Sequence, residues 1–260
     1  MSPVRLVGVG VGPGDPELVT LKAVRVLRTA DAVFVPVAAS GEVGRAEAVV
    51  AAHVDPAPVR RLVFSLDPSD AERDRSWERS ASAVAGALAR APEGATAAFA
   101  TIGDPSVYST FTYLVQRVSA LLPGLEVEVV PGVTAMQDLA ARSGIPLVVG
   151  SERLALLPLV AGAAGLDRAL GQHDTVVCYK GGARLPELLE AIGRAGRLGS
   201  AVYGARLGLP DQQVCPASEM EGRRGPYLST VIVYPSRRAL SLKAIARPNH
   251  QVQSLRVEAG

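Results

Sequence analysis

Short apolar segments alternate along the chain with segments whose apolar residues recur at helical spacing. The first half predicts strands at Arg5 to Val11, Ala32 to Pro36, Arg61 to Phe64 and Ala95 to Ala100. Between them, Leu18, Leu21, Val24 and Leu27 form one predicted helical stripe, and Trp77, Ala81, Val84 and Leu88 form another. This alternation is typical of an α/β fold with mostly parallel strands.

A helix predicted to start near Val107 ends at the break Leu122-Pro123-Gly124, where a second half begins. Its predicted strands are Glu126 to Val130, Arg153 to Leu156, Thr175 to Tyr179, Ala201 to Ala205 and Tyr227 to Val233. Several later strands follow one another with no helix between them, which favours a mixed sheet with antiparallel members. We therefore predict an N-terminal α/β domain over residues 1–122, a C-terminal one over 125–236, and a peripheral basic tail over 237–260.

Length, charge and cysteine usage limit the kinds of partner and cellular location that we expect for this protein. The chain has 260 residues, 48% of them hydrophobic, and a net charge of +2. From Arg237 onward it carries five Lys or Arg and one acid, so the excess of positive charge lies in the tail. That distribution argues against a nucleic-acid partner. We expect no membrane partner and a cytoplasmic location, because no apolar run reaches membrane length and no secretory signal is visible. Cys178 and Cys215 fit no metal spacing and are expected to be reduced.

Glycine-rich turns follow several predicted strands. The first, Gly12-Pro13-Gly14-Asp15-Pro16, fails the dinucleotide signature, since no register places glycines at relative positions one, three and six. Its two prolines remove amide donors and make it a poor phosphate cradle, although Asp15 suits the N-cap of a helix. The turn is either a stiff connector or a rigid wall beside an adenosine or apolar ligand.

Three further turns share this position after a strand. They are Thr101-Ile102-Gly103-Asp104-Pro105, Pro131-Gly132-Val133-Thr134-Ala135 and Lys180-Gly181-Gly182. Ligands of open parallel sheets bind beyond the carboxyl ends of the strands. Four such turns spread over both halves predict one cleft between two domains.

The segments VGVGPGDPELVTLKA, TIGDPSVYSTFTYL, VVPGVTAMQDLAARSGIPL and YLSTVIVYP resemble the tetrapyrrole methylase family over about residues 4 to 235. The resemblance implies two α/β domains with S-adenosylmethionine in the cleft between them, and a homodimer. Within the family, GDPSVYSTFTYL, ERLALLP and GLPDQQV are most similar to members that methylate C20 of precorrin-2, giving precorrin-3A. Members acting on cobalt-factor II are closely similar, and uroporphyrinogen III stays open as the acceptor.

The resemblance also implies site residues. The donor pocket would include Pro13, Ile102, Gly103, Asp104, Val107, Thr134, Ala135, Tyr179, Lys180 and Leu209. Lys180 replaces a methionine common in related enzymes, so it could face the substrate instead. Arg45, Tyr108 and Arg184 are candidate contacts to the substrate, whose many carboxylates favour cationic partners.

The role of Asp104, the catalytic base and the function class each need a further statement. Asp104 is expected to accept hydrogen bonds from the donor, or else to cap the following helix. No catalytic base can be named, and no metal site is predicted. The alternative function outside the enzymes is a non-catalytic module that binds adenosine or a tetrapyrrole. A nicotinamide oxidoreductase is excluded, because the glycines do not have the spacing of the dinucleotide signature.

Overall fold

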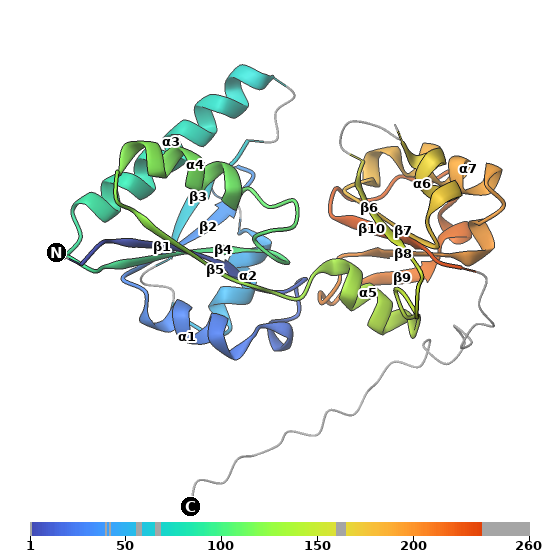
Figure 1. The fold of residues 1–260 in the computed structure, drawn as a ribbon, viewed down its shortest axis with the longest axis horizontal. Coiled ribbons are helices and arrows are strands. Elements are labelled where there is room, and N and C mark those ends of the chain that lie inside the picture. Colours follow the sequence, from blue (N-terminus) through green and yellow to red (C-terminus); the bar gives the residue numbers. More distant parts are fainter. Residues whose placement is uncertain are drawn as a thin grey trace, which may run out of the picture.

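A computed structural model describes residues 2–39, 41, 43–55, 59–65, 69–159 and 165–235. Its helices and strands form two units, each built around its own five-stranded sheet (Figure 1). This arrangement confirms the predicted α/β class. The tail predicted over residues 237–260 lies outside the described residues.

The first sheet is parallel throughout and has the strand order β3-β2-β4-β1-β5. Its strands are β1 (Arg5–Gly10), β2 (Ala32–Val37), β3 (Val59–Val63), β4 (Thr96–Thr101) and β5 (Glu126–Val130). Four of them were predicted for the first half. Because the strands are parallel, their carboxyl ends all lie at one edge of the sheet.

The fifth strand corrects our placement of the break between the halves. We expected Glu126–Val130 to open the second half, but β5 pairs in parallel with β1, with Arg5 opposite Glu126 and Val9 opposite Val130. The break at Leu122-Pro123-Gly124 is therefore the connection from a helix back to its own sheet. Pairing with β5 satisfies the backbone groups along one side of β1, which local sequence does not reveal.

Helices cover both faces of the first sheet (Figure 1). One face carries α1 (Leu21–Thr29) and α2 (Arg45–Ala51), and the other carries α3 (Asp70–Ala89) and α4 (Phe111–Leu121). Successive strand residues point to opposite faces, so Leu6 packs with the α3 and α4 side and Val7 with the α1 and α2 side. Burial on both faces explains why the central strands β1, β2 and β4 are almost continuously apolar, whereas the edge strands β3 and β5 carry charged residues.

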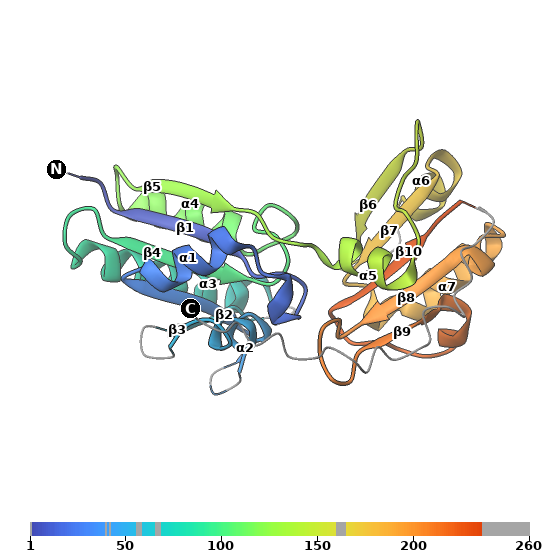
Figure 2. The same cartoon turned by 90° about the horizontal axis from the view of Figure 1, so that it is seen from below.

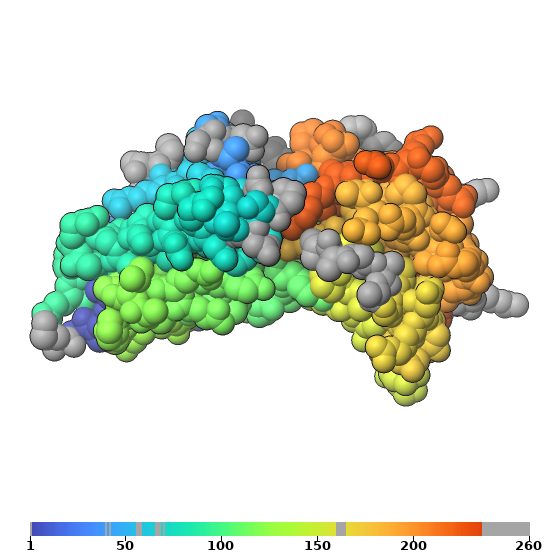
Figure 3. All heavy atoms as spheres, turned by 90° about the horizontal axis from the view of Figure 1, so that it is seen from above, coloured from blue at the N-terminus to red at the C-terminus, as the bar shows by residue number. Residues whose placement is uncertain are grey.

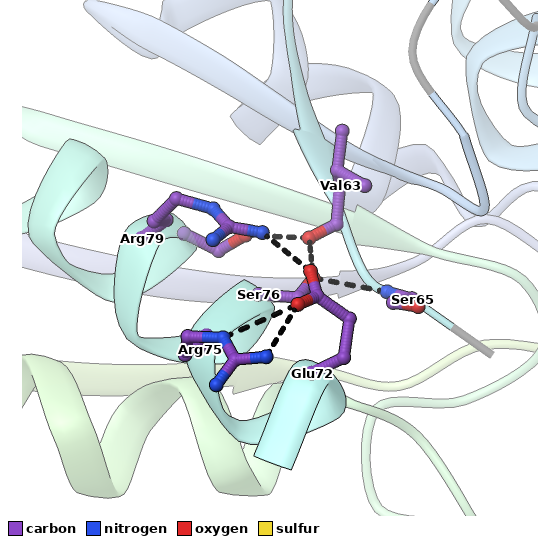
Figure 4. A network of polar contacts seen from close by, with 7 residues as sticks. Val63, Ser65, Glu72, Arg75, Ser76 and Arg79 are labelled. Atoms are coloured by element: carbon purple, nitrogen blue, oxygen red, sulfur yellow. Dashed lines mark hydrogen bonds and ion pairs between the residues drawn. The ribbon is translucent and has the colours of Figure 1, made fainter. Parts of the chain in front are cut away.

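The predicted core face of α3 is confirmed. Ala81, Val84 and Leu88 are buried, and Trp77 packs partly buried against the same cluster. Polar contacts tie this helix to the end of β3, where Ser76 Oγ donates to Val63 O at 2.7 Å and accepts from Ser65 N at 3.0 Å (Figure 4). The edge strand is thereby fixed just before Phe64, which lines the cavity described below.

Two helix predictions in the first half were wrong in detail. Leu21 is 89% exposed and does not belong to a core stripe; Ala23 and Leu27 are the buried residues of α1. The chain forms a short 3-10 turn, η1 (Pro16–Leu18), and then starts a new helix at the Thr20 N-cap, which shifts the helical phase.

The helix predicted from Val107 starts at Phe111 instead, as α4. Tyr108 has φ of 49°, a left-handed conformation that cannot continue a right-handed helix. Ser109 Oγ then accepts from the amide of Phe111 at 3.1 Å and satisfies one donor of the new helix end.

The second sheet has the order β6-β7-β10-β8-β9. Its strands are β6 (Leu154–Pro158), β7 (Thr175–Tyr179), β8 (Ala201–Ala205), β9 (Gln213–Pro216) and β10 (Ser229–Val233). β6 and β7 are parallel, whereas β10 runs antiparallel to β7 and β8, and β9 antiparallel to β8. The predicted mixed sheet is confirmed. β9 was not predicted, because this short edge strand carries little apolar pattern.

Helices again cover both faces of this sheet. They are α5 (Ala135–Ser143) on one face, and α6 (Leu166–Gln172) and α7 (Leu185–Arg194) on the other, with the short turns η2 (Gly182–Arg184), η3 (Leu198–Ser200) and η4 (Ala217–Met220). Cys178 is buried beneath α7, Cys215 is half-buried, and both are free thiols. Burial raises the pKa of Cys178 to about 12.

The two units lie side by side as two lobes (Figures 2 and 3). The chain crosses from one to the other directly after β5, so α5 of the second unit begins close to the carboxyl edge of the first sheet. Among the described residues, no helix has both the length and the apolar character needed to cross a membrane. The division into two domains remains our prediction.

Candidate functional site

A cavity of about 400 Å³ lies where the carboxyl edge of the first sheet faces the second unit. Turns after β1, β2, β4, β5, β7 and β8 contribute residues to it, so both units form its wall. Its lining is mainly apolar, with a small number of polar groups. That volume and composition are typical of a site for a small organic molecule.

The first three glycine turns meet behind the wall of this cavity. The amide of Gly103 donates to Gly12 O at 2.7 Å, which joins the turn after β4 to the turn after β1. A Cβ on Gly132 would lie 2.2 Å from Gly103 O, and a Cβ on Gly10 would lie 2.6 Å from the same atom. Only glycine allows three backbones to approach so closely.

Asp104 is buried and joins the second turn to the third. Its Oδ1 accepts from the amide of Ser106 at 2.7 Å and from the Ser106 hydroxyl, while its Oδ2 accepts from the amide of Gly132 at 2.9 Å. Burial alone would raise the pKa of this carboxyl, but the hydrogen bonds outweigh burial and hold the pKa below its ordinary value. The carboxylate therefore fixes the shape of the loop pair.

The third turn leads into α5, whose first turn is anchored by a capping residue of the helix itself and by the end of β7. Gln137 Oε1 accepts from the amide of Thr134 at 2.8 Å, as in a capping box. The Tyr179 hydroxyl accepts from the amide of Met136 at 2.9 Å and so links the end of β7 to the start of α5. Thr134, Ala135 and Tyr179 are thus placed together at the cavity.

Two non-glycine residues in left-handed conformation line the cavity, one from each unit. Tyr108 has φ of 49° and Lys180 has φ of 58°. Lys180 Nζ donates to Tyr108 O at 2.8 Å, and the Tyr108 hydroxyl donates to Leu156 O at 3.0 Å, so both bonds run between the units. Strained backbone of this kind concentrates at functional sites, because the surrounding contacts must hold it in place.

Positive charge gathers at the same cavity. Burial lowers the pKa of Lys180, whose ammonium lies 5.7 Å from the centre of the Tyr227 ring. Burial, followed by the nearby positive charge of Arg206, lowers the pKa of Arg45 at the start of α2. A cation that is half-buried near another cation is a suitable partner for an anionic group of a ligand.

Most residues predicted for the site line this one cavity. They are Pro13, Arg45, Ile102, Gly103, Asp104, Val107, Tyr108, Thr134, Ala135, Tyr179 and Lys180. Leu209 lies outside the lining, in the turn after β8, where its amide donates to Arg206 O. Arg184 also lies outside it and pairs with Glu187 at 3.2 Å.

Sequence reasoning missed several lining residues. Gly204 and Leu207 come from the end of β8, and Phe64 comes from the end of β3. The segment 227–230 at the start of β10 contributes four more. The position of Leu207 and Phe64 at predicted strand ends could have indicated them. The β10 residues carried no such signal, because β10 is antiparallel and presents its amino end to the cavity.

The sequence of this chain is similar to those of known proteins over most of its length. Residues 5–221 match the model of the Tetrapyrrole (Corrin/Porphyrin) Methylases. The chain is 36% identical over 238 residues to a precorrin-2 C(20)-methyltransferase of Sinorhizobium sp., covering 88% of this chain and 94% of that protein. It is 31% identical over 232 residues to a cobalt-precorrin-2 C(20)-methyltransferase of Salmonella typhimurium, covering 88% and 95%.

A solved structure agrees with these sequence matches. The uroporphyrin-III C-methyl transferase of Thermus thermophilus, complexed with S-adenyl homocysteine, has a TM-score of 0.58 and 26% identity to this chain. The likeness covers 89% of this chain and 97% of that one. The match therefore extends over both sheets. This protein belongs to the tetrapyrrole (corrin/porphyrin) methylase family.

Proposed function

We propose that this protein transfers a methyl group from S-adenosylmethionine to C20 of precorrin-2 in cobalamin biosynthesis. The observation that carries the proposal is a single cavity built from strand-end turns of both units, in a chain related to named C20-methyltransferases. One relative is named for precorrin-2 and the other for cobalt-precorrin-2. The cobalt-bearing acceptor is therefore the second candidate substrate.

The residues at the cavity fit such a donor. Gly103 has φ of 73°, and nothing lies within 4 Å of the position that a Cβ would take there, so space is open beside this turn. Pro13, Ile102, Val107 and Ala135 offer apolar surface for an adenosine, while Thr134 and Tyr179 offer hydroxyl groups. Pro13 has no amide hydrogen, which suits a ligand without phosphate.

The chemistry asks little acid or base help of the protein. A sulfonium donor supplies an electrophilic methyl together with its own leaving group, the neutral thioether, and C20 then releases the proton that the methyl group replaces. The chain's own task is to hold donor and acceptor in line, and alignment of this kind supplies roughly 7–11 kcal/mol of the barrier. Turns joined by glycine contacts, and by Asp104 between them, form a rigid support for that alignment.

The acceptor would lie toward the cationic side of the cavity. Arg45 and Lys180 line the cavity from the first and the second unit, respectively. Tetrapyrrole precursors carry several carboxylates, and charge-assisted hydrogen bonds to such groups are the strong ones. We expect these two residues, together with Tyr108, to set the position of the ring. Leu209 and Arg184 lie outside the cavity lining, so this proposal gives them no role in binding.

The test is turnover with defined acceptors. Purified protein, S-adenosylmethionine and enzymatically made precorrin-2 should yield a product that has gained one methyl group, located at C20 by NMR. The same assay with cobalt-factor II and with uroporphyrinogen III separates the candidate acceptors. Absence of methyl gain with both C20 acceptors, despite donor binding, would overturn the assignment and favour a non-catalytic binding module.

The assembly and location of the protein also stay proposals. We expect a homodimer, as the family resemblance implies, and a cytoplasmic site of action. Light scattering coupled to size-exclusion chromatography measures the first, and fractionation of the cells that make the protein measures the second.

A further inference from the structure

A second connection between the units lies behind the cavity and involves no residue assigned above to the ligands. Arg142, in the last turn of α5, places its Nε 2.8 Å from Asp138 Oδ1. Its Nη2 lies 3.6 Å from Asp15 Oδ2, which belongs to the first glycine turn. One guanidinium therefore joins a helix of the second unit to a loop of the first.

Arg142 is held in place by its ion pair with Asp138, which lies in the same helix. The Asp138 side chain is 5% exposed, and leaving such a carboxylate without a cation would be costly. The ion pair follows helical spacing, i to i+4, so it forms within α5 itself. Asp138 thus orients the guanidinium through Nε, and Nη2 lies toward Asp15 of the other unit.

The backbone beside this ion pair is in direct contact across the same boundary. A Cβ on Gly14 would lie 2.3 Å from Leu207 O, and a Cβ on Gly208 would lie 2.1 Å from the amide nitrogen of Asp15. Pro13 and Leu207, immediately next to these contacts, both line the cavity. Movement at this joint would therefore move two parts of the cavity wall relative to each other.

We propose that Arg142 is a positioning residue, which holds the Pro13 turn against the second unit through Asp15 and so sets the shape of the donor site. This rests on the proposed function, because it takes the donor to be the ligand beside Pro13. The contact is partly exposed, with Arg142 at 25% and Asp15 at 32%, so its contribution is modest and screened by salt.

The variant that isolates the contact is Asp15→Asn. Asp15 Oδ1 also accepts from the amide of Glu17 at 2.9 Å, and the Asn oxygen keeps that cap while the charge is lost. Arg142→Met keeps the apolar stem but leaves Asp138 unpaired, so its folding is checked by the melting temperature. Arg194→Met is the matched control, since Arg194 also ends a helix and pairs i to i+4, with Glu190, away from the cavity.

The readout is the Kd of S-adenosylhomocysteine by calorimetry, together with separate KM values for donor and tetrapyrrole. Asp15→Asn should raise the Kd and the donor KM about fivefold at low salt, with the tetrapyrrole KM unchanged and the melting temperature lowered by no more than about 4 °C. Asp15→Asn combined with Arg142→Met should lose no more affinity than Arg142→Met alone, because both remove one contact.

Three results would overturn the proposal. They are a Kd in both single variants equal to that of the unmodified protein, an equal loss in Arg194→Met, or losses in the double variant that multiply. If the unmodified protein itself fails to bind S-adenosylhomocysteine, the proposed function fails and this inference fails with it.

Discussion

At the scale of single residues, two of the three described non-glycine residues with a positive φ, Tyr108 and Lys180, line the cavity, whereas the third, Arg206, lies outside the lining. Gly103 needs φ of 73° to bring its turn against Gly12, whereas Tyr108 and Lys180 adopt similar angles despite having side chains. A side chain in this conformation costs about 1–2 kcal/mol, so its contacts must compensate. The bond from Lys180 Nζ to Tyr108 O joins these two strained residues directly.

Replacing Gly103 by Ala should weaken donor binding beyond its effect on stability. The new Cβ would meet no atom of the protein, but it would enter the space beside the turn, and the backbone angle costs about 1 kcal/mol. Gly150→Ala is the control, because Gly150 also has a positive φ, of 60°, with nothing nearby, and lies outside the cavity. Urea unfolding should show similar losses in both, and calorimetry a loss of S-adenosylhomocysteine affinity in Gly103→Ala alone. Equal affinities would make the turn a connector only.

The lowered pKa of Lys180 predicts a pH-dependent contribution to stability. Burial lowers the pKa in the folded state below the ordinary 10.5, so between the two values the unfolded chain binds the extra proton. Stability from this group therefore rises with pH across that window. The free energy of unfolding of the unmodified protein, minus that of Lys180→Met, should increase from pH 7 toward pH 10. A difference that stays constant, measured by urea unfolding at each pH, would contradict the buried-ammonium interpretation.

At the scale of elements, the turns after β1, β4 and β5 act as one assembly. Gly10, Gly103 and Gly132 bring three loops into backbone contact, and Asp104 bridges two of them. The parallel sheet makes this possible, because β4, β1 and β5 are neighbours and their carboxyl ends coincide. Rigidity at the site is therefore a consequence of strand order.

Gly132→Ala adds only one methyl group, but it should lower the stability of the protein strongly. Its Cβ would lie 2.2 Å from Gly103 O and 2.8 Å from Gly10 Cα, so the loops must separate. We expect a loss of about 2–4 kcal/mol in the free energy of unfolding. Gly171→Ala in α6 is the control: nothing lies near that position, and alanine favours the helix by roughly 0.5–1 kcal/mol. A Gly132→Ala protein as stable as the unmodified one would show that the loops tolerate separation.

At the scale of the whole molecule, the cavity exists only where two units meet. Turns of the first sheet provide one wall, and the ends of β7 and β8 with the start of β10 provide the other. Lys180 with Tyr108, and Arg142 with Asp15, connect the units at two places. A ligand in this cavity would bind both units at once.

Donor binding should accordingly stabilise both units together. S-adenosylhomocysteine at one hundred times its Kd should raise the free energy of unfolding by about 2.7 kcal/mol. Hydrogen exchange should slow in peptides covering residues 101–107 of the first unit and 204–209 of the second, while residues 78–88 of α3 serve as the unaffected reference. Protection confined to one unit would contradict a shared site.

Much of this organisation could be predicted from local sequence. Thr175–Tyr179 and Ala201–Ala205 were predicted with the bounds that the structure has, and β1, β2 and β4 to within a residue at each end. Their continuous apolar runs and flanking turns are properties of the segments themselves. The glycine turns that form the first wall of the cavity were found in the same way, since proline and glycine restrict the backbone locally.

Other features were decided only by tertiary structure, because they depend on which backbone lies beside which. The pairing of β5 with β1 moved a whole strand into the first sheet, and the bond from Lys180 to Tyr108 O joined residues 72 positions apart. The start of β10 entered the cavity wall because β10 pairs antiparallel with β7 and β8, an orientation that no segment specifies alone. The sequence by itself determined every strand except β9, as well as the rigid turns and the family. Long-range contacts decided where the two walls of the site meet. The free energy of such a contact depends on both segments that form it, so neither segment alone predicts it.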